Sequence, residues 1–162
     1  MLILNIYVKP YLAEYARHKY PSPLSNVVRF PSSSLVNHAI VNELVETPQN
    51  TTQRIGNLLV MVNEAICDLK DIERYNYLTL TDEIKVGEKL LIDFDAHLHS
   101  YMDNKRYRQG VDYKDSAENF IKEYHLSGLV TAEALLKKHV RWKKKVTHYR
   151  TESVQLKMNF DK

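Results

Sequence analysis

Apolar residues recur every three or four positions through the middle of the chain, and this spacing constrains the fold more than any other feature. At about 100° per residue, their side chains fall within one arc roughly 120° wide, as an amphipathic helix requires. We therefore expect a helix with its N-cap at Thr81 and with Asp82 and Glu83 in the first turn, where the helix dipole favours acidic groups. The apolar arc consists of Ile84, Leu90, Leu91, Phe94, Leu98, Tyr101 and Met102.

The same stretch contains two aspartates and two histidines, at Asp93, Asp95, His97 and His99. On a strand all of these side chains would project from one face and could bind a metal ion. On the predicted helix, Asp95 and His99 lie on one flank of the apolar arc, and Asp93 and His97 lie on the other. We therefore expect two separate acid–histidine pairs, with no metal and no cofactor.

The first 80 residues show a different pattern, in which short apolar runs alternate with prolines. Runs of this length predict buried strands, although periodicity alone does not separate residues 55–62 from a buried helix. Serines at positions 32–34 offer N-caps for one of the helices between them. We expect strands at residues 2–8, 27–30, 55–62 and 75–80, and helices at residues 11–19 and 35–44.

These patterns predict an α+β protein in which a small antiparallel sheet with helices precedes a helical C-terminal part. We divide the chain into a mixed α/β scaffold at residues 1–80, a helical region at residues 81–150 and a tail at residues 151–162. The length of 162 residues is enough for a substantial hydrophobic core.

Positive charge is concentrated in the sequence TAEALLKKHVRWKKK, from Thr131 to Lys145, and in its continuation to Arg150. Residues 137–150 include seven Lys or Arg and no Asp or Glu. The whole chain has 23 basic and 20 acidic residues, so the remainder has 16 basic against 20 acidic and a net charge of −4. A local positive stretch on a slightly acidic body favours contact with a polyanion or a membrane surface.

On a helix, five of these cations lie within about 120° of one another, while Leu135, His139, Trp142 and Val146 cluster on a different side. Such a helix has one face to pack and one face for an anion, which predicts contacts to DNA phosphates. Two alternatives stay open. The lysines can simply suit a helix C-terminus and keep the protein soluble, or the helix can bind lipid or a protein. The predicted phosphate contacts are Lys137, Lys138, Arg141, Lys144 and Lys145.

The segment before the basic helix resembles the first part of a helix-turn-helix. A helix is expected at residues 115–124, followed by a turn that includes Gly128 and a cap at Thr131. The connection from Tyr124 to Thr131 is longer than the usual turn of that motif, so we describe it as helix-turn-helix-like. Residues 103–112 are expected to form a loop whose Arg106 and Arg108 are auxiliary phosphate contacts.

Nothing in the sequence predicts catalysis. The four glycines are isolated and cannot form a local phosphate-binding loop, and neither a nucleophile elbow nor zinc-ligand spacing occurs. We expect a non-enzymatic protein, since an enzyme would need a folded pocket that gathers several histidines and carboxylates. The single cysteine, Cys67, and the lack of a secretion signal predict a cytoplasmic location, and no apolar run is long enough to span a membrane.

Two stretches resemble small proteins of phages and mobile elements of the Bacteroidetes: VKPYLAEYARHKY with VRFP near the N-terminus, and FIKEYHLSGLVTAEALLKKHVRWKKK near the C-terminus. The second stretch is similar to compact helical modules that bind DNA. The resemblance carries over no activity and no functional residue. With the charge pattern, it leads us to expect a DNA-binding protein with a regulatory or replication-related role in a phage or mobile element. The alternative is a structural or assembly protein that forms a homo-oligomer or binds a protein partner.

Overall fold

The computed structural model describes residues 1–48, 55–62, 71 and 74–160, with side chains described as far as His148. The polar segment at residues 49–53, which the sequence predicts to be a loop, and Cys67 lie outside the described residues. Within them the chain forms five helices and five short strands, which confirms the predicted α+β class. The helices are α1 (Pro10–Lys19), α2 (Leu35–Glu43), α3 (Leu80–Gln109), α4 (Tyr113–Glu123) and α5 (Ala132–Phe160). The strands are β1 (Ile3–Ile6), β2 (Val27–Val28), β3 (Val45–Glu46), β4 (Leu58–Met61) and β5 (Tyr75–Tyr77).

The main sheet has the strand order β1-β4-β2 and is mixed, not purely antiparallel as expected. Strand β1 runs antiparallel to β4 with Ile3 opposite Met61, whereas β2 runs parallel to β4 with Val27 beside Leu59. Parallel neighbours need a crossover connection, and α2 lies in the chain between β2 and β4. The sequence pattern predicted where the strands of this sheet lie. It did not indicate whether neighbouring strands run parallel or antiparallel.

A second sheet consists of two antiparallel strands, β3 and β5. Strand β3 follows the end of α2, and strand β5 precedes the start of α3. Its strand β5 forms the first part of the strand expected at residues 75–80. Its other strand, β3, was not predicted, because two residues are too few to show an alternating pattern.

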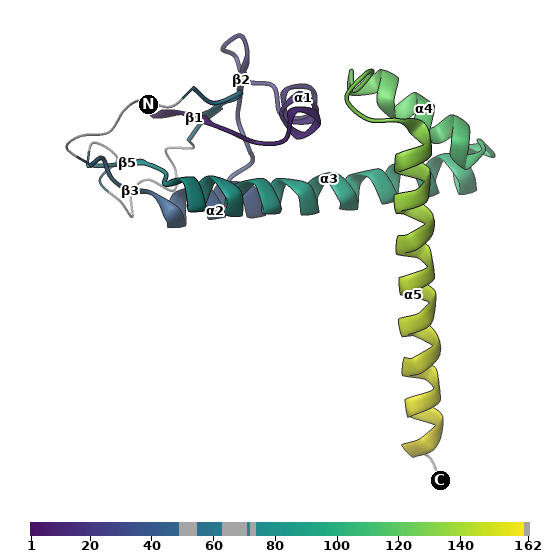
Figure 1. Ribbon diagram of the computed structural model, residues 1–162. Helices are drawn as coiled ribbons and strands as arrows, with labels where there is room; N and C mark the ends of the chain where they lie inside the picture. The colour runs from purple at the N-terminus through teal and green to yellow at the C-terminus, as the bar shows by residue number, and fades with distance from the viewer. Residues whose placement is uncertain (49–54, 63–70, 72–73, 161–162) are drawn as a thin grey trace.

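Helix α3 extends across the molecule, with the main sheet, α1 and α2 at one end and α4 and α5 at the other (Figure 1). Its buried face includes Leu90, Phe94 and Leu98, which confirms the helical spacing. The ring of Phe94 packs edge-on against Tyr15 of α1 and Phe120 of α4, with centroid distances of 5.0 and 5.7 Å. One aromatic side chain therefore contacts the helices before and after α3.

The C-terminal end of α3 corrects our expectation of a loop at residues 103–112. The helix continues to Gln109 and ends at Gly110, whose φ of 70° lies in the left-handed region that favours glycine. The amide N of Gly110 donates to the carbonyl of Arg106, 3.2 Å away. No glycine or proline precedes Gly110 in this stretch, so nothing ends the helix earlier.

Helices α4 and α5 are joined by residues 124–131, as expected for the helix-turn-helix-like segment. Thr131 caps α5, since its Oγ1 accepts a hydrogen bond of 3.2 Å from the amide N of Ala134. Helix α5 runs crosswise to α3, and its C-terminal end lies far from every other element (Figure 1). It continues to Phe160, through the residues that we expected to form a tail. Among the described residues, no helix combines the length and apolarity that crossing a membrane requires.

The N-terminus of α3 is capped by Thr79, not by Thr81. Thr79 Oγ1 accepts a hydrogen bond from the amide N of Asp82, and Asp82 Oδ2 accepts one from the amide N of Thr79, both at 3.3 Å. This reciprocal capping box begins the helix two residues before the expected position.

The two threonines give a matched test of this start. Thr79→Ala should lower the free energy of unfolding by about 1 kcal/mol, because it removes the cap. Thr81→Ala should change it by less than about 0.5 kcal/mol, because Thr81 is exposed within the first turn. Urea unfolding followed by circular dichroism measures both values, and equal effects would contradict the assigned cap.

Candidate nucleic-acid interface

The basic side chains of α5 divide into two sets, and carboxylates of α3 bind the first set. Lys138 places its Nζ 2.5 Å from Asp95 Oδ1 and 5.7 Å from the ring centroid of Phe94. Lys143 places its Nζ 3.0 Å from Asp103 Oδ1. Both lysine side chains are only about one third exposed, so these ion pairs hold α5 on α3.

Lys138 therefore does not belong to the outward surface on which we expected it. It follows the buried Leu135 by three positions, which places it on the flank of the packed face. From that flank its long side chain covers apolar surface with its stem while its amine reaches Asp95. Lys143, which we had not included among the phosphate contacts, is bound in the same way.

The second set lies on the exposed face of α5, and we call it the outer stripe: Lys137, Arg141, Lys144 and Lys145. The spacing of i, i+4, i+7 and i+8 places these residues along one side of the helix. Lys137 has an exposed ion pair of 2.7 Å with Glu133, of a kind that contributes only about 0.3–0.5 kcal/mol. Within the part of the chain that the structure describes, Arg141, Lys144 and Lys145 have no acidic partner.

A shallow groove lies beside the outer stripe. It has a volume of about 530 Å³ and is open to solvent along most of its length. Of its two lysines, Lys143 is paired with Asp103, whereas Lys144 has no acidic partner among the described residues. It is lined by Val140, Lys143, Lys144, Thr147 and His148.

The two auxiliary arginines lie near the end of α3, on the helix instead of a loop. Arg106 places its Nη1 3.5 Å from Asp112 Oδ1 and its guanidinium 5.8 Å from the ring centroid of Tyr113. Arg108 is exposed and has no acidic partner among the described residues. Between them, the Tyr107 hydroxyl accepts a hydrogen bond of 3.0 Å from Lys143, so this end of α3 touches α5.

A buried pair of histidines holds α5 against α3. The Nδ1 atoms of His99 and His139 lie 3.1 Å apart, and the ring of Trp142 stacks on His99 with a centroid distance of 4.4 Å. In such a contact one nitrogen donates and the other accepts, so at least one of the two rings is neutral. Burial, and secondarily the nearby His139, lowers the pKa of His99 from 6.5 to about 4. Burial also lowers the pKa of His139.

The two flanks of α3 face different helices, as predicted, but the two expected acid–histidine contacts do not form among the described side chains, because each of these groups contacts a neighbouring helix instead. Asp93 and His97 face α1, where the Tyr15 hydroxyl lies 3.1 Å from Asp93 Oδ2 and 3.1 Å from His97 Nδ1. Asp95 and His99 face α5. Within the described ranges, no group of three or more His, Cys, Asp or Glu side chains is placed to hold a metal ion.

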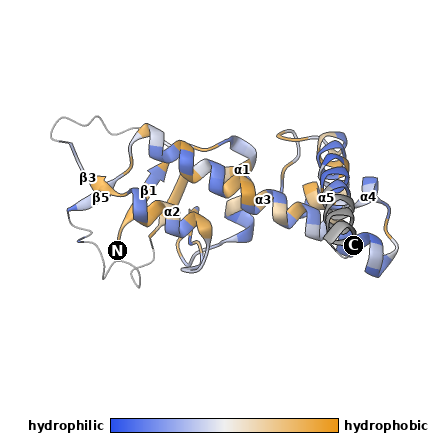
Figure 2. Ribbon diagram, turned by 90° about the horizontal axis from the view of Figure 1, so that it is seen from below, coloured by the Kyte–Doolittle hydropathy of each residue, from blue (hydrophilic) through white to orange (hydrophobic). Residues whose placement is uncertain are grey.

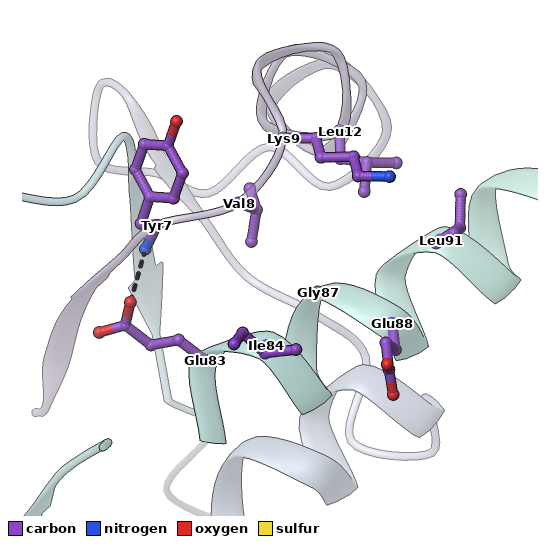
Figure 3. Close-up of a pocket in the computed structure, with 9 residues that line it drawn as sticks. All are labelled: Tyr7, Val8, Lys9, Leu12, Glu83, Ile84, Gly87, Glu88 and Leu91. Carbon is purple, nitrogen blue, oxygen red and sulfur yellow. Dashed lines mark hydrogen bonds between the residues drawn. The ribbon is translucent and has the colours of Figure 1, made fainter. Parts of the chain in front are cut away.

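A separate apolar pocket of about 400 Å³ lies between the link from β1 to α1 and the first half of α3 (Figure 3). Its edge is fixed by the amide N of Tyr7, which donates to Glu83 Oε2 at 3.3 Å. Its charged lining side chains are two carboxylates, Glu83 and Glu88, and one amine, Lys9. Sequence reasoning missed it because two distant segments form it. The lining residues are Tyr7, Val8, Lys9, Leu12, Glu83, Ile84, Gly87, Glu88 and Leu91.

Because the histidine pair holds α5 against α3, we expect acidic pH to lower the stability of this packing. The folded chain keeps His99 neutral, whereas an unfolded chain takes up its proton near pH 6.5. Stability is therefore fully present above about pH 6.5 and is lost as the pH falls toward 4. We expect His99 to account for about 1–2 kcal/mol of this loss, allowing for partial solvent screening.

Urea unfolding of wild type and of His99→Gln, each near pH 7 and pH 5, measures how much His99 contributes to the loss of stability in acid. The glutamine does not titrate, so its variant should lose less stability on acidification than wild type. His38→Gln, which replaces an exposed histidine of α2, is the matched control and should behave as wild type. An unchanged acid response of His99→Gln would contradict the assigned role of the pair.

Comparisons of the chain with models of known protein families, with curated proteins and with solved structures give no match.

Proposed function

We propose that this protein binds DNA by contacting phosphates with the outer stripe of α5. The observation that carries the proposal is the division of the cations into two sets. Lys138 and Lys143 are neutralised by carboxylates of α3, whereas Arg141, Lys144 and Lys145 are exposed and without an acidic partner among the described residues. Cations that only maintained the fold would be expected to resemble the first set.

The chemistry of the stripe suits a polyanion with regularly spaced charges. Each cation that neutralises a phosphate releases condensed counterions, and this release gives DNA binding its strong dependence on salt. The stripe covers residues 137–145, about 12 Å of helix at 1.5 Å per residue. That length spans several phosphates of one strand, which are about 3.4 Å apart along the axis.

The proposed mode differs from that of a helix-turn-helix recognition helix. In that motif, residues at the N-terminus of the second helix contact base edges. Here the first turn of α5 carries Ala132 and Glu133, and the cations lie further along the helix. The proposal is therefore phosphate binding with little sequence readout. A regulatory or replication-related role in a phage or mobile element is the setting that the sequence resemblance favours.

Fluorescence anisotropy of labelled duplex DNA, measured between about 50 and 200 mM salt, tests the proposal. Replacing Arg141, Lys144 and Lys145 together with Ala should weaken binding. It should also reduce the slope of log affinity against log salt by about 2.7, or roughly 0.9 for each lost phosphate contact. Absence of binding by the wild-type protein at the lower salt concentration would overturn the proposal.

Two controls separate the stripe from net charge and from folding. Replacing the exposed Lys9, Lys89 and Lys122 with Ala removes the same charge from other elements and should leave the salt slope nearly unchanged. Lys138→Ala should lower stability, because it leaves Asp95 without its amine, but should preserve the slope. Equal losses in the two triple variants would indicate non-specific attraction to net charge.

A further inference from the structure

The most exposed aromatic ring among the described side chains lies near the end of α3, beside the basic helix. It is the ring of Tyr107, which is 73% exposed. In Figure 2, α5 is seen end-on at this C-terminal part of α3, and a hydrogen bond from α5 to Tyr107 joins the two helices. Most of the ring therefore faces solvent although its residue contacts a neighbouring helix.

The Tyr107 side chain is held at its hydroxyl. This hydroxyl accepts the hydrogen bond of 3.0 Å from Lys143 Nζ. The amine of Lys143 is itself fixed, because it lies 3.0 Å from Asp103 Oδ1 and also donates to the Tyr113 hydroxyl. A rigid ring that is already anchored loses little conformational entropy when a ligand packs on it.

The charges around this ring suit a ligand that has both a flat aromatic group and an anion. Arg106 and Arg108 precede and follow Tyr107, so on the helix they lie about 100° to either side of it. Arg108 is exposed and has no acidic partner among the described residues. Lys143 also lines the groove on α5 together with Lys144 of the outer stripe. The ring therefore lies beside the surface that we assign to phosphates.

A nucleotide combines these two groups, since it has a flat base and a phosphate. Aromatic side chains stack on bases of any sequence, because every base has a π-face, while nearby cations follow the phosphates. Inside a duplex, both faces of a base are covered by neighbouring bases. A ring such as that of Tyr107 can therefore stack only on a base that has left the duplex or lies in a single strand.

We infer that Tyr107 is a stacking platform for a base of single-stranded DNA whose phosphates lie on the outer stripe. This inference rests on the proposed function, because the stripe supplies the phosphate contacts. It adds the substrate class, since the platform favours single strands over duplex while the stripe binds the phosphates of both.

Fluorescence anisotropy with three labelled probes of equal length tests the platform. The probes are oligothymidylate, a strand of the same length without bases, and a duplex. Tyr107→Ala should weaken binding of oligothymidylate about 5- to 100-fold, the range expected for one lost base stack. It should change the affinity for the other two probes by less than about two-fold, because their phosphates still reach the stripe.

Two further variants separate stacking from the hydroxyl and from the loss of any exposed tyrosine. Tyr107→Phe keeps the ring and removes only the hydrogen bond from Lys143, so it should retain most of the affinity for oligothymidylate. Tyr7→Ala removes another exposed tyrosine, which is 60% exposed and lies just after β1, and should bind all three probes as wild type does.

The outcomes distinguish this inference from the proposed function. If Tyr107→Ala leaves oligothymidylate binding unchanged, weakens all three probes equally, or is matched by Tyr107→Phe, the stacking platform is wrong and phosphate binding by the stripe still stands. A wild-type protein that binds none of the probes at about 50 mM salt would overturn the proposed function and this inference with it.

Discussion

The packing of one apolar face of α3 is the interaction on which the rest of the structure depends. Phe94 touches an aromatic ring on α1 and another on α4, and Leu90 and Leu98 continue the buried face on either side. Each of the other four helices of the described chain contacts this helix (Figure 1). Without α3, the three short strands of the main sheet and the two short helices beside it would bury too little surface to be stable alone.

Polar groups on the two flanks of α3 then set the orientation of its neighbours. On one flank, Asp93 accepts hydrogen bonds from Tyr15 and Tyr20 and so positions α1. On the other flank, Asp95 and Asp103 bind lysines of α5. The acidic residues of α3 thus neutralise one side of the basic helix and leave the other side available to an external anion. The segregation of charge in the sequence becomes, in the fold, a segregation between two faces of one helix.

The helical spacing of residues 84–102 and the basic face of α5 could be predicted because both depend on local periodicity. The parallel pairing of β2 with β4 could not, because it depends on how a distant segment returns to the sheet. Lys138 was misplaced for a related reason: its angular position lies at a boundary, and only the location of Asp95 decides which way it points. The pocket beside Gly87 and the contact between His99 and His139 likewise join residues from distant segments.

The attachment of α5 through its first half has a mechanical consequence. The residues from Lys144 to Phe160 form an arm of about 25 Å, at 1.5 Å per residue. Such an arm amplifies motion at its base, so a tilt of about 10° around the Trp142 contact would displace the tip by about 4 Å. Small changes in the packing of two imidazoles and one indole are thereby converted into movements as large as the diameter of a side chain. The helix that carries the basic residues therefore pivots at its base, on the stacking contact between Trp142 and His99.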